Sequence, residues 1–206
     1  MAVTKRREHA LISESEYLEG EQVSDIRHEY VAGEVYAMVG GKVNHVLIAG
    51  NVSGELRARL KDQDCMVFQS DMKLRTAEGS FRYPDVMVVC EDDTQSDLYR
   101  QAPVIIVEVL SSATRKVDQT SKLREYTQIP SLQAYLLIEQ DCVDVEVMRR
   151  SNGWRSEHFF LGDAVEFPSL GVSVPVEEIY ARVQNADVDA YLKAQQDAEQ
   201  SEQEQE

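Results

Sequence analysis

The sequence predicts an α/β fold in which a mixed sheet is flanked by helices. Two apolar, β-branched runs, Tyr83–Val89 and Val104–Ser111, are typical of buried strands. Between residues 43 and 60, apolar side chains recur at three- and four-residue steps, which predicts a helix with one face packed on the sheet. The order of elements shows no domain boundary before an acidic tail, so we expect a domain at 1–184 and a low-complexity tail at 185–206.

The elements expected around these strands follow from local signals. Ser13 with Glu16 resembles a capping box, and Gly and Pro residues mark turns. In chain order, we expect a helix at Glu14–Gly20, a hairpin at Ile26–Val39 broken at Ala32-Gly33, a helix at Val43–Leu60, a strand at Cys65–Leu74 and a turn at Thr76–Ser80. Further on, we expect loops at 91–101 and 111–118, a helix at Gln119–Gln128, a strand at Ala134–Glu139, a C-terminal antiparallel meander (Asp144–Arg150, Trp154–Leu161, Val165–Phe167) and a short helix at Val176–Val183.

The net charge of −16 argues against a general nucleic-acid coating protein, which would be basic. Residues 185–206 hold seven acidic residues and one lysine, a net of −6, which leaves −10 for the body. An acidic site remains compatible with a nuclease, because bound cations reverse the local charge.

The chain carries no apolar run long enough to cross a bilayer and no apolar segment near Met1, so we expect a cytoplasmic protein without membrane contact. The three cysteines, Cys65, Cys90 and Cys142, are widely spaced and odd in number. We therefore expect free thiols in a reducing compartment.

Each of the two apolar strands carries one carboxylate, Asp85 in the first and Glu108 in the second. A carboxylate is costly to bury unless it is paired or binds a metal. If the strands are neighbours, both side chains can hold a divalent cation such as Mg²⁺, which suits a few carboxylates and several waters. The alternative is two carboxylates at the solvent edge that cap loops or pair with arginines.

Several stretches of the chain together form a specific pattern. They are Tyr30-x-x-Gly33-Glu34-Val35, the His45 helix, Tyr83-Pro84-Asp85, and Glu108-Val109-Leu110-Ser111 followed by Thr114, Asp118, Lys122 and Tyr126. This pattern resembles the restriction-endonuclease-like family called Uma-two, within the PD-(D/E)XK nuclease superfamily. The resemblance covers roughly Ser13 to Val183. It implies a restriction endonuclease-like core with the metal site at one end of the sheet.

The resemblance implies that Asp85 and Glu108 are the metal ligands. Leu110 stands where the superfamily usually has its lysine, so the standard motif is broken. In related variants the following helix supplies the lysine, and Lys122 is the candidate, four residues after Asp118 and four before Tyr126. The alternative for Lys122 is a solvated pair with Asp118.

Other candidates carry weaker signals. Asp71 could be a further metal ligand or an exposed strand residue, and Gln69 shares its strand face. Glu34 resembles an acid that some members bring from an N-terminal element, or it is a charge beside a turn. His45 could contact phosphate or simply begin its helix, and Arg115 in the loop beside the site could meet a phosphate backbone.

These features predict a metal-dependent endonuclease that hydrolyses DNA with Mg²⁺ or Mn²⁺ bound at Asp85 and Glu108 and with help from Lys122. The competing hypothesis is an inactive nuclease fold that serves as a binding or assembly module. Lys122 close to the carboxylates would favour the enzyme. Lys122 turned to solvent, or an arginine in the carboxylate pocket, would favour the module. The exposed meander could also form a homodimer.

Overall fold

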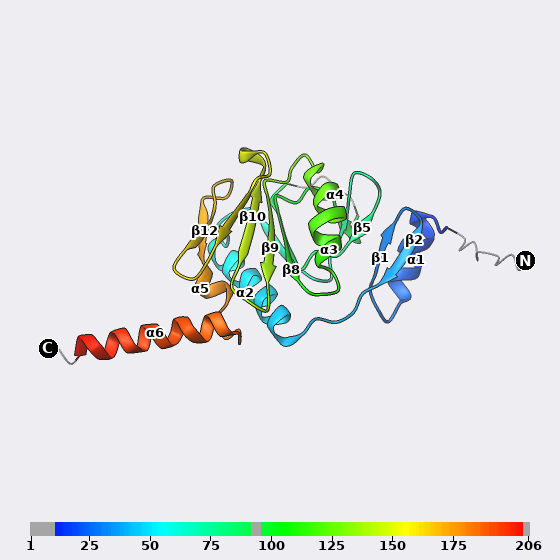
Figure 1. The fold of residues 1–206 in the computed structure, drawn as a ribbon. Helices are drawn as coiled ribbons and strands as arrows, with labels where there is room; N and C mark the ends of the chain where they lie inside the picture. Colours follow the sequence, from blue (N-terminus) through cyan, green and yellow to red (C-terminus); the bar gives the residue numbers. More distant parts are fainter. Residues whose placement is uncertain (1–10, 92–95, 204–206) are drawn as a thin grey trace, which may run out of the picture.

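The computed structural model describes residues 11–91 and 96–203 and has the mixed α/β architecture that the sequence predicts. A six-stranded sheet forms its centre, with strand order β11-β10-β9-β8-β6-β3 (Figure 1). Its strands are β3 (Met66–Gln69), β6 (Val86–Val89), β8 (Ile105–Leu110), β9 (Ala134–Glu139), β10 (Val145–Arg149) and β11 (Ser156–Phe159). Only β8 and β9 run parallel, and the other neighbours are antiparallel.

Helices cover both faces of this sheet. On one face, α2 (Val43–Arg59) buries Ile48, Val52 and Leu56 against strand residues such as Val107. On the other face lies a helical segment made of α3 (Arg115–Val117), a π-helical turn η1 (Asp118–Lys122) and α4 (Leu123–Thr127). The helix predicted at 119–128 is therefore present, but it begins earlier, at Arg115.

The direction of the Glu108 side chain follows from the alternation along β8. Val107 and Val109 belong to the core under α2, whereas Ile106 and Leu110 belong to the core under α4. Successive side chains of a strand point to opposite faces, so Glu108 shares the α4 face with Ile106 and Leu110.

A second sheet, with strand order β2-β1-β5-β4-β7, lies beside the first near the N-terminus. Its strands are β1 (His28–Val31), β2 (Glu34–Ala37), β4 (Lys73–Arg75), β5 (Phe81–Arg82) and β7 (Tyr99–Arg100). Helix α1 (Glu14–Val23) packs on it through Tyr17, whose ring stacks 5.1 Å from that of Tyr30. The predicted capping box of α1 and the predicted hairpin β1–β2 are both confirmed.

The prediction of one strand at Cys65–Leu74 is wrong. The chain turns at Ser70, whose φ of +55° is left-handed, so β3 stays in the central sheet while β4 joins the second. Strand β6 begins at Val86, three residues after the start of the apolar run Tyr83–Val89, which leaves Asp85 just outside the strand.

The C-terminal part differs from the predicted meander at its third strand. Strands β10 and β11 pair antiparallel, with Gly153 left-handed between them. Strand β12 (Ala164–Phe167) pairs instead with β13 (Val172–Pro175) in a separate sheet. The remaining elements are a 3₁₀ turn η2 (Arg150–Asn152), α5 (Val176–Ile179), which ends before the predicted Val183, and α6 (Ala186–Gln203).

The acidic tail is helical over Ala186–Gln203, and the first turn of this helix is attached to the body. Val188 is buried against the core under α2, and Asp187 accepts a hydrogen bond of 2.8 Å from the Val143 N–H. The rest of α6 extends away from the domain (Figure 1). No helix within the described residues has the length and hydrophobicity that a membrane crossing requires.

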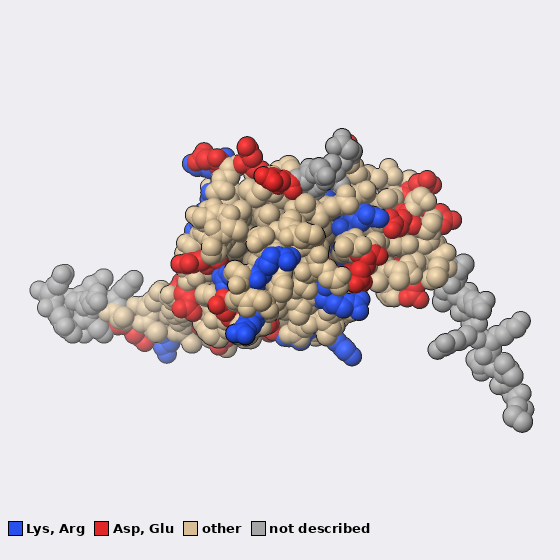
Figure 2. Space-filling model, turned by 90° about the horizontal axis from the view of Figure 1, so that it is seen from above, with Lys and Arg blue, Asp and Glu red and all other residues tan. Residues whose placement is uncertain are grey.

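Basic and acidic side chains are interspersed on the face shown in Figure 2, and no continuous basic band crosses it. Many arginines are held by carboxylates. The pairs include Arg75 with Glu14 and Arg149 with Glu157. The face in Figure 2 thus shows no continuous row of basic side chains of the kind that tracks a duplex backbone.

The prediction of three free thiols is wrong for two of them. Cys65 precedes β3 and Cys90 follows β6, and the pairing of Met66 with Val89 places the two cysteines side by side. They form a disulfide, whereas Cys142 is free and exposed. The number and spacing of the cysteines in the sequence cannot reveal this disulfide, because the bond depends on which strands are neighbours.

The cysteine arrangement predicts the alkylation pattern of the purified, denatured protein. Without reductant, we expect one alkyl group per chain, on Cys142, because the other two sulfurs are bonded to each other. After reduction, we expect all three cysteines to react. Peptide mass spectrometry makes the comparison, and alkylation of Cys65 and Cys90 without reductant would contradict the bonded form.

Candidate active site

Asp85 lies at the end of the central sheet, where β6 begins. Its Oδ2 accepts a hydrogen bond of 2.7 Å from the backbone N–H of Val109, and its Oδ1 lies 3.0 Å from Nε2 of His45. Val86 pairs with Val107 across β6 and β8, and the same register continued by one residue sets Asp85 opposite Glu108. The sheet therefore brings the two predicted carboxylates to one place.

Glu108 is buried and hydrogen-bonded to two side chains of the covering helix. Its Oε1 accepts from Nζ of Lys122 at 2.9 Å and from the hydroxyl of Tyr126 at 3.0 Å. The same ammonium lies 3.1 Å from Oδ1 of Asp118 and 3.3 Å from Oε1 of Glu29. One buried ammonium is thus surrounded by three carboxylates from β8, the helix and the β1 strand.

The covering helix reaches this position through its π-helical turn. Asp118 and Lys122 begin and end the turn, and both are buried. The wide turn loosens the usual backbone bonding, and the Asp118 carbonyl accepts a hydrogen bond of 3.1 Å from the Tyr135 hydroxyl. Such turns inside α-helices are rare and frequently lie at functional sites.

Glu29 is held between two cations. Arg82 lies 2.8 Å from Glu29 and binds Glu125 through two hydrogen bonds of 2.6 and 3.1 Å. Burial raises the pKa of Glu29, but the charges of Lys122 and Arg82 outweigh it and lower the pKa overall. The β1–β2 hairpin is thereby connected to the helix on the opposite side of the site.

Burial and neighbouring charges shift the pKa values of Glu108 and Lys122. Desolvation raises the pKa of Glu108 well above its ordinary value, and the charges of Asp118 and Asp85 raise it further against the opposing effect of Lys122. Burial alone would lower the pKa of Lys122, but Glu108, Glu29 and Asp118 together raise it. The charges around Lys122 thus favour its protonated form, and burial favours the protonated form of Glu108.

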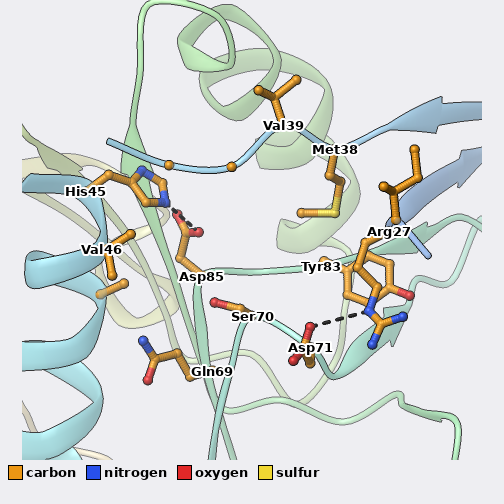
Figure 3. A pocket seen from close by; sticks show the side chains of 14 residues that line it. Arg27, Met38, Val39, His45, Val46, Gln69, Ser70, Asp71, Tyr83 and Asp85 are labelled. Carbon is orange, nitrogen blue, oxygen red and sulfur yellow. Dashed lines mark hydrogen bonds and ion pairs between the residues drawn. The ribbon is translucent and has the colours of Figure 1, made fainter. Parts of the chain in front are cut away.

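A hollow of about 320 Å³, here called the Asp85 hollow, opens beside this cluster (Figure 3). Asp85 and His45 point toward each other at one side of it, and Asp71 pairs with Arg27 at 3.3 Å on the other. Gln69 also lines the hollow. The hydrogen bond to Asp85 raises the pKa of His45 against the effect of burial.

Two predicted residues make other contacts. Glu34 is exposed and accepts a hydrogen bond from the Tyr36 hydroxyl on its own strand. Arg115 lies in α3 rather than in a loop, and both its terminal nitrogens bind Glu139. A phosphate that bound Arg115 would therefore compete with a carboxylate already present.

Glu29 is the N-terminal acid that reaches Lys122, whereas the sequence offered Glu34 for that position or as a charge beside a turn. The two residues lie on paired strands, and only the three-dimensional packing of the hairpin shows which one points inward. The one sequence signal for Glu29 is that this carboxylate lies between His28 and Tyr30, in a strand that packs on a core.

No three His, Cys, Asp or Glu side chains among residues 11–91 and 96–203 form a ready-made metal cage. The charges nevertheless suit a cation. Asp85, Glu29, Glu108, Asp118 and Glu125 supply five carboxylates against two cations, Lys122 and Arg82, which is a net of −3 when all are ionised. A divalent cation beside Asp85 and Glu108 would offset the repulsion that raises the pKa of Glu108.

Known proteins similar to this chain are nuclease-like or uncharacterized. An uncharacterized protein, slr1290, from Synechocystis sp. strain PCC 6803 is 34% identical over 173 residues, which is 82% of this chain and 91% of the relative. A second uncharacterized protein of that organism, sll1609, is 37% identical over 140 residues, which is 66% of this chain and 79% of the relative.

The crystal structure of "a putative nuclease belonging to DUF820" from Anabaena variabilis superposes with a TM-score of 0.69. The match covers 84% of this chain and 99% of that one, at 17% sequence identity, and shows a common fold. The family model "Uma2: Putative restriction endonuclease" matches residues 14–177. That match spans most of the chain and confirms the family that its motifs predict, so the chain belongs to the Uma2 family of putative restriction endonucleases.

Proposed function

We propose that this protein is a metal-dependent endonuclease that hydrolyses DNA phosphodiester bonds through Asp85, Glu108 and Lys122. The observation that carries the proposal is the Lys122 ammonium, 2.9 Å from Glu108 Oε1. Leu110, in the usual lysine position, is buried in the core under α4. Lys122 supplies from the helix the charge that Leu110 cannot, and the family and fold support a nuclease.

Asp85 and Glu108 would hold Mg²⁺ or Mn²⁺, both of which take oxygen ligands. Asp71 stays a predicted further ligand. When bound, the cation would supply Lewis-acid stabilisation of the negative charge that develops on the phosphoryl oxygens.

The surrounding groups would hold the reacting ones in place. The N–H of Val109 and the His45 ring fix both oxygens of Asp85. Glu29 and Asp118 hold the Lys122 ammonium, which would orient the attacking water and stabilise phosphoryl charge.

The module hypothesis predicts different contacts. It expects Lys122 in solvent or an arginine in the carboxylate pocket. Lys122 is buried, and Arg82 binds Glu29 and Glu125 rather than Asp85 or Glu108. These contacts favour the enzyme over the assembly module.

Asp85→Asn should abolish cleavage while the protein stays folded. We expect the wild type to cut plasmid or single-stranded DNA with Mg²⁺ or Mn²⁺. The variant should be slower by about 100-fold or more, because the amide is a poor ligand. Agarose gels and thermal melts measure the two properties. Asp62→Asn, an exposed carboxylate elsewhere, is the control, and Asp71→Asn tests the further ligand. Equal cleavage by wild type and Asp85→Asn would refute the proposed site.

Lys122→Met should lower the free energy of unfolding by about 3 to 5 kcal/mol, because it leaves buried carboxylates without their counter-charge. The loss should diminish as the pH falls, since burial raises the pKa of Glu108 and its protonation removes its repulsion of the neighbouring carboxylates. Urea titrations at about pH 5 and about pH 8 make the comparison. A loss that is larger at the lower pH would contradict the assigned charges.

Glu108→Gln should gain stability relative to the wild type as the pH rises. The folded pKa of Glu108 lies above the unfolded value of 4.5. Above pH 4.5 the unfolded wild type therefore releases a proton that the folded state retains, which destabilises the fold until the pH passes the folded pKa. The glutamine variant lacks this loss. Metal-free thermal melts across this range should show a widening difference, and a narrowing one would disprove the raised pKa.

A further inference from the structure

Two hollows lie next to each other at the start of α2. The Asp85 hollow is lined by Gly40, Gly41 and His45. A second one of about 490 Å³, here called the Lys42 hollow, is lined by the interleaved residues Lys42, Asn44 and Leu47 and by Gln140, Asp141 and Arg182. The first turn of α2 and the residues before it form a shared wall.

The rim of the Asp85 hollow is apolar and exposed. Ile26, Met38, Val39 and Val46 line it, and Val39 is 93% exposed. Its only lysine or arginine, Arg27, is paired with Asp71. Such a surface suits the flat apolar face of a nucleobase, whose polar edge could meet Gln69 and Ser70 (Figure 3).

The Lys42 hollow is positively charged. Lys42 and Arg182 line it against one carboxylate, Asp141, which gives a net of +1. Within the described part of the chain, neither cation has a carboxylate at ion-pair distance. Gln140 is also part of the lining and is 2% exposed, and its Oε1 has no hydrogen-bond partner among the described residues. Unpaired cations beside a polar wall suit a phosphate and its sugar.

The wall between the two hollows leaves room for a DNA strand to lie across it. Gly40 and Gly41 present no side chain there, and a Cβ at Gly41 would lie 2.5 Å from Cδ2 of His45. Position 41 is therefore restricted to glycine as long as His45 points toward Asp85. A flexible single strand could cross this backbone from one hollow to the other.

We propose that the protein binds an unpaired DNA strand, with a base in the Asp85 hollow and an adjoining phosphate on Lys42 and Arg182 in the Lys42 hollow. The proposal rests on the proposed nuclease function and names its substrate class. A base must leave the stack to enter a hollow, and this costs least where the strand is already single or unpaired. The acidic chain also lacks the charge that a long duplex contact needs.

Binding to short fluorescein-labelled DNA in EDTA tests the proposal, because binding is then measured without cleavage. Fluorescence anisotropy should give a Kd for a single strand, and for a duplex with an unpaired bulge, on the order of tenfold lower than for a blunt duplex of the same sequence. Equal or tighter binding of the blunt duplex would overturn the proposal.

Lys42→Gln and Arg182→Gln test the phosphate contact. Each should weaken single-strand binding and lower the slope of log K against log salt by about 0.7. Lys61→Gln and Arg155→Gln are matched controls, because both side chains are exposed and have no ion pair within the described residues. Lys61 follows the far end of α2, about 25 Å from Lys42. Equal effects in the controls would overturn the Lys42 hollow as the site.

The outcomes separate the two proposals. If the protein binds the blunt duplex most tightly and cuts it in a way that depends on Asp85, the nuclease proposal stands and the single-strand inference is overturned. If the protein binds single strands selectively through Lys42 and Arg182 but cleaves no DNA, the single-strand site stands and the nuclease proposal is overturned.

Discussion

The site depends on one buried ammonium. Lys122 is surrounded by Glu108 from the central sheet, Asp118 from its own helix and Glu29 from the hairpin. A charge removed from water is tolerated only where it is paired, so the Lys122 ammonium can stay buried only while these three elements remain together. The ion cluster thus stabilises a contact between parts of the chain that share little apolar core.

Asp85 is fixed in a different way. It lies just beyond a strand, and its carboxylate replaces a backbone carbonyl as the acceptor for the Val109 N–H. The sheet itself therefore orients one oxygen, and α2 orients the other through His45. A carboxylate held by two rigid elements needs no loop closure to reach its position.

Patterns with a local cause could be predicted from the sequence. The α2 periodicity, the α1 capping box and the apolar runs of β6 and β8 each depend on neighbours in the chain. The selection of Asp85 and Glu108 as candidates also used a local pattern, because each is the single carboxylate of an apolar run. The break at Ser70, the Cys65–Cys90 bond and the inward side chain of Glu29 depend on which strands meet, and no local pattern records that.

The π-helical turn at Asp118–Lys122 has a consequence for how related sequences are compared. An α-helix rotates by about 100° per residue, so a wide turn shifts the phase of everything after it. A relative shorter by one residue here would form a plain helix. Either Lys122 and Tyr126 would then leave Glu108, or Arg115 would leave Glu139. A one-residue gap at this place in an alignment is therefore a change in the chemistry of the site, not a difference in loop length.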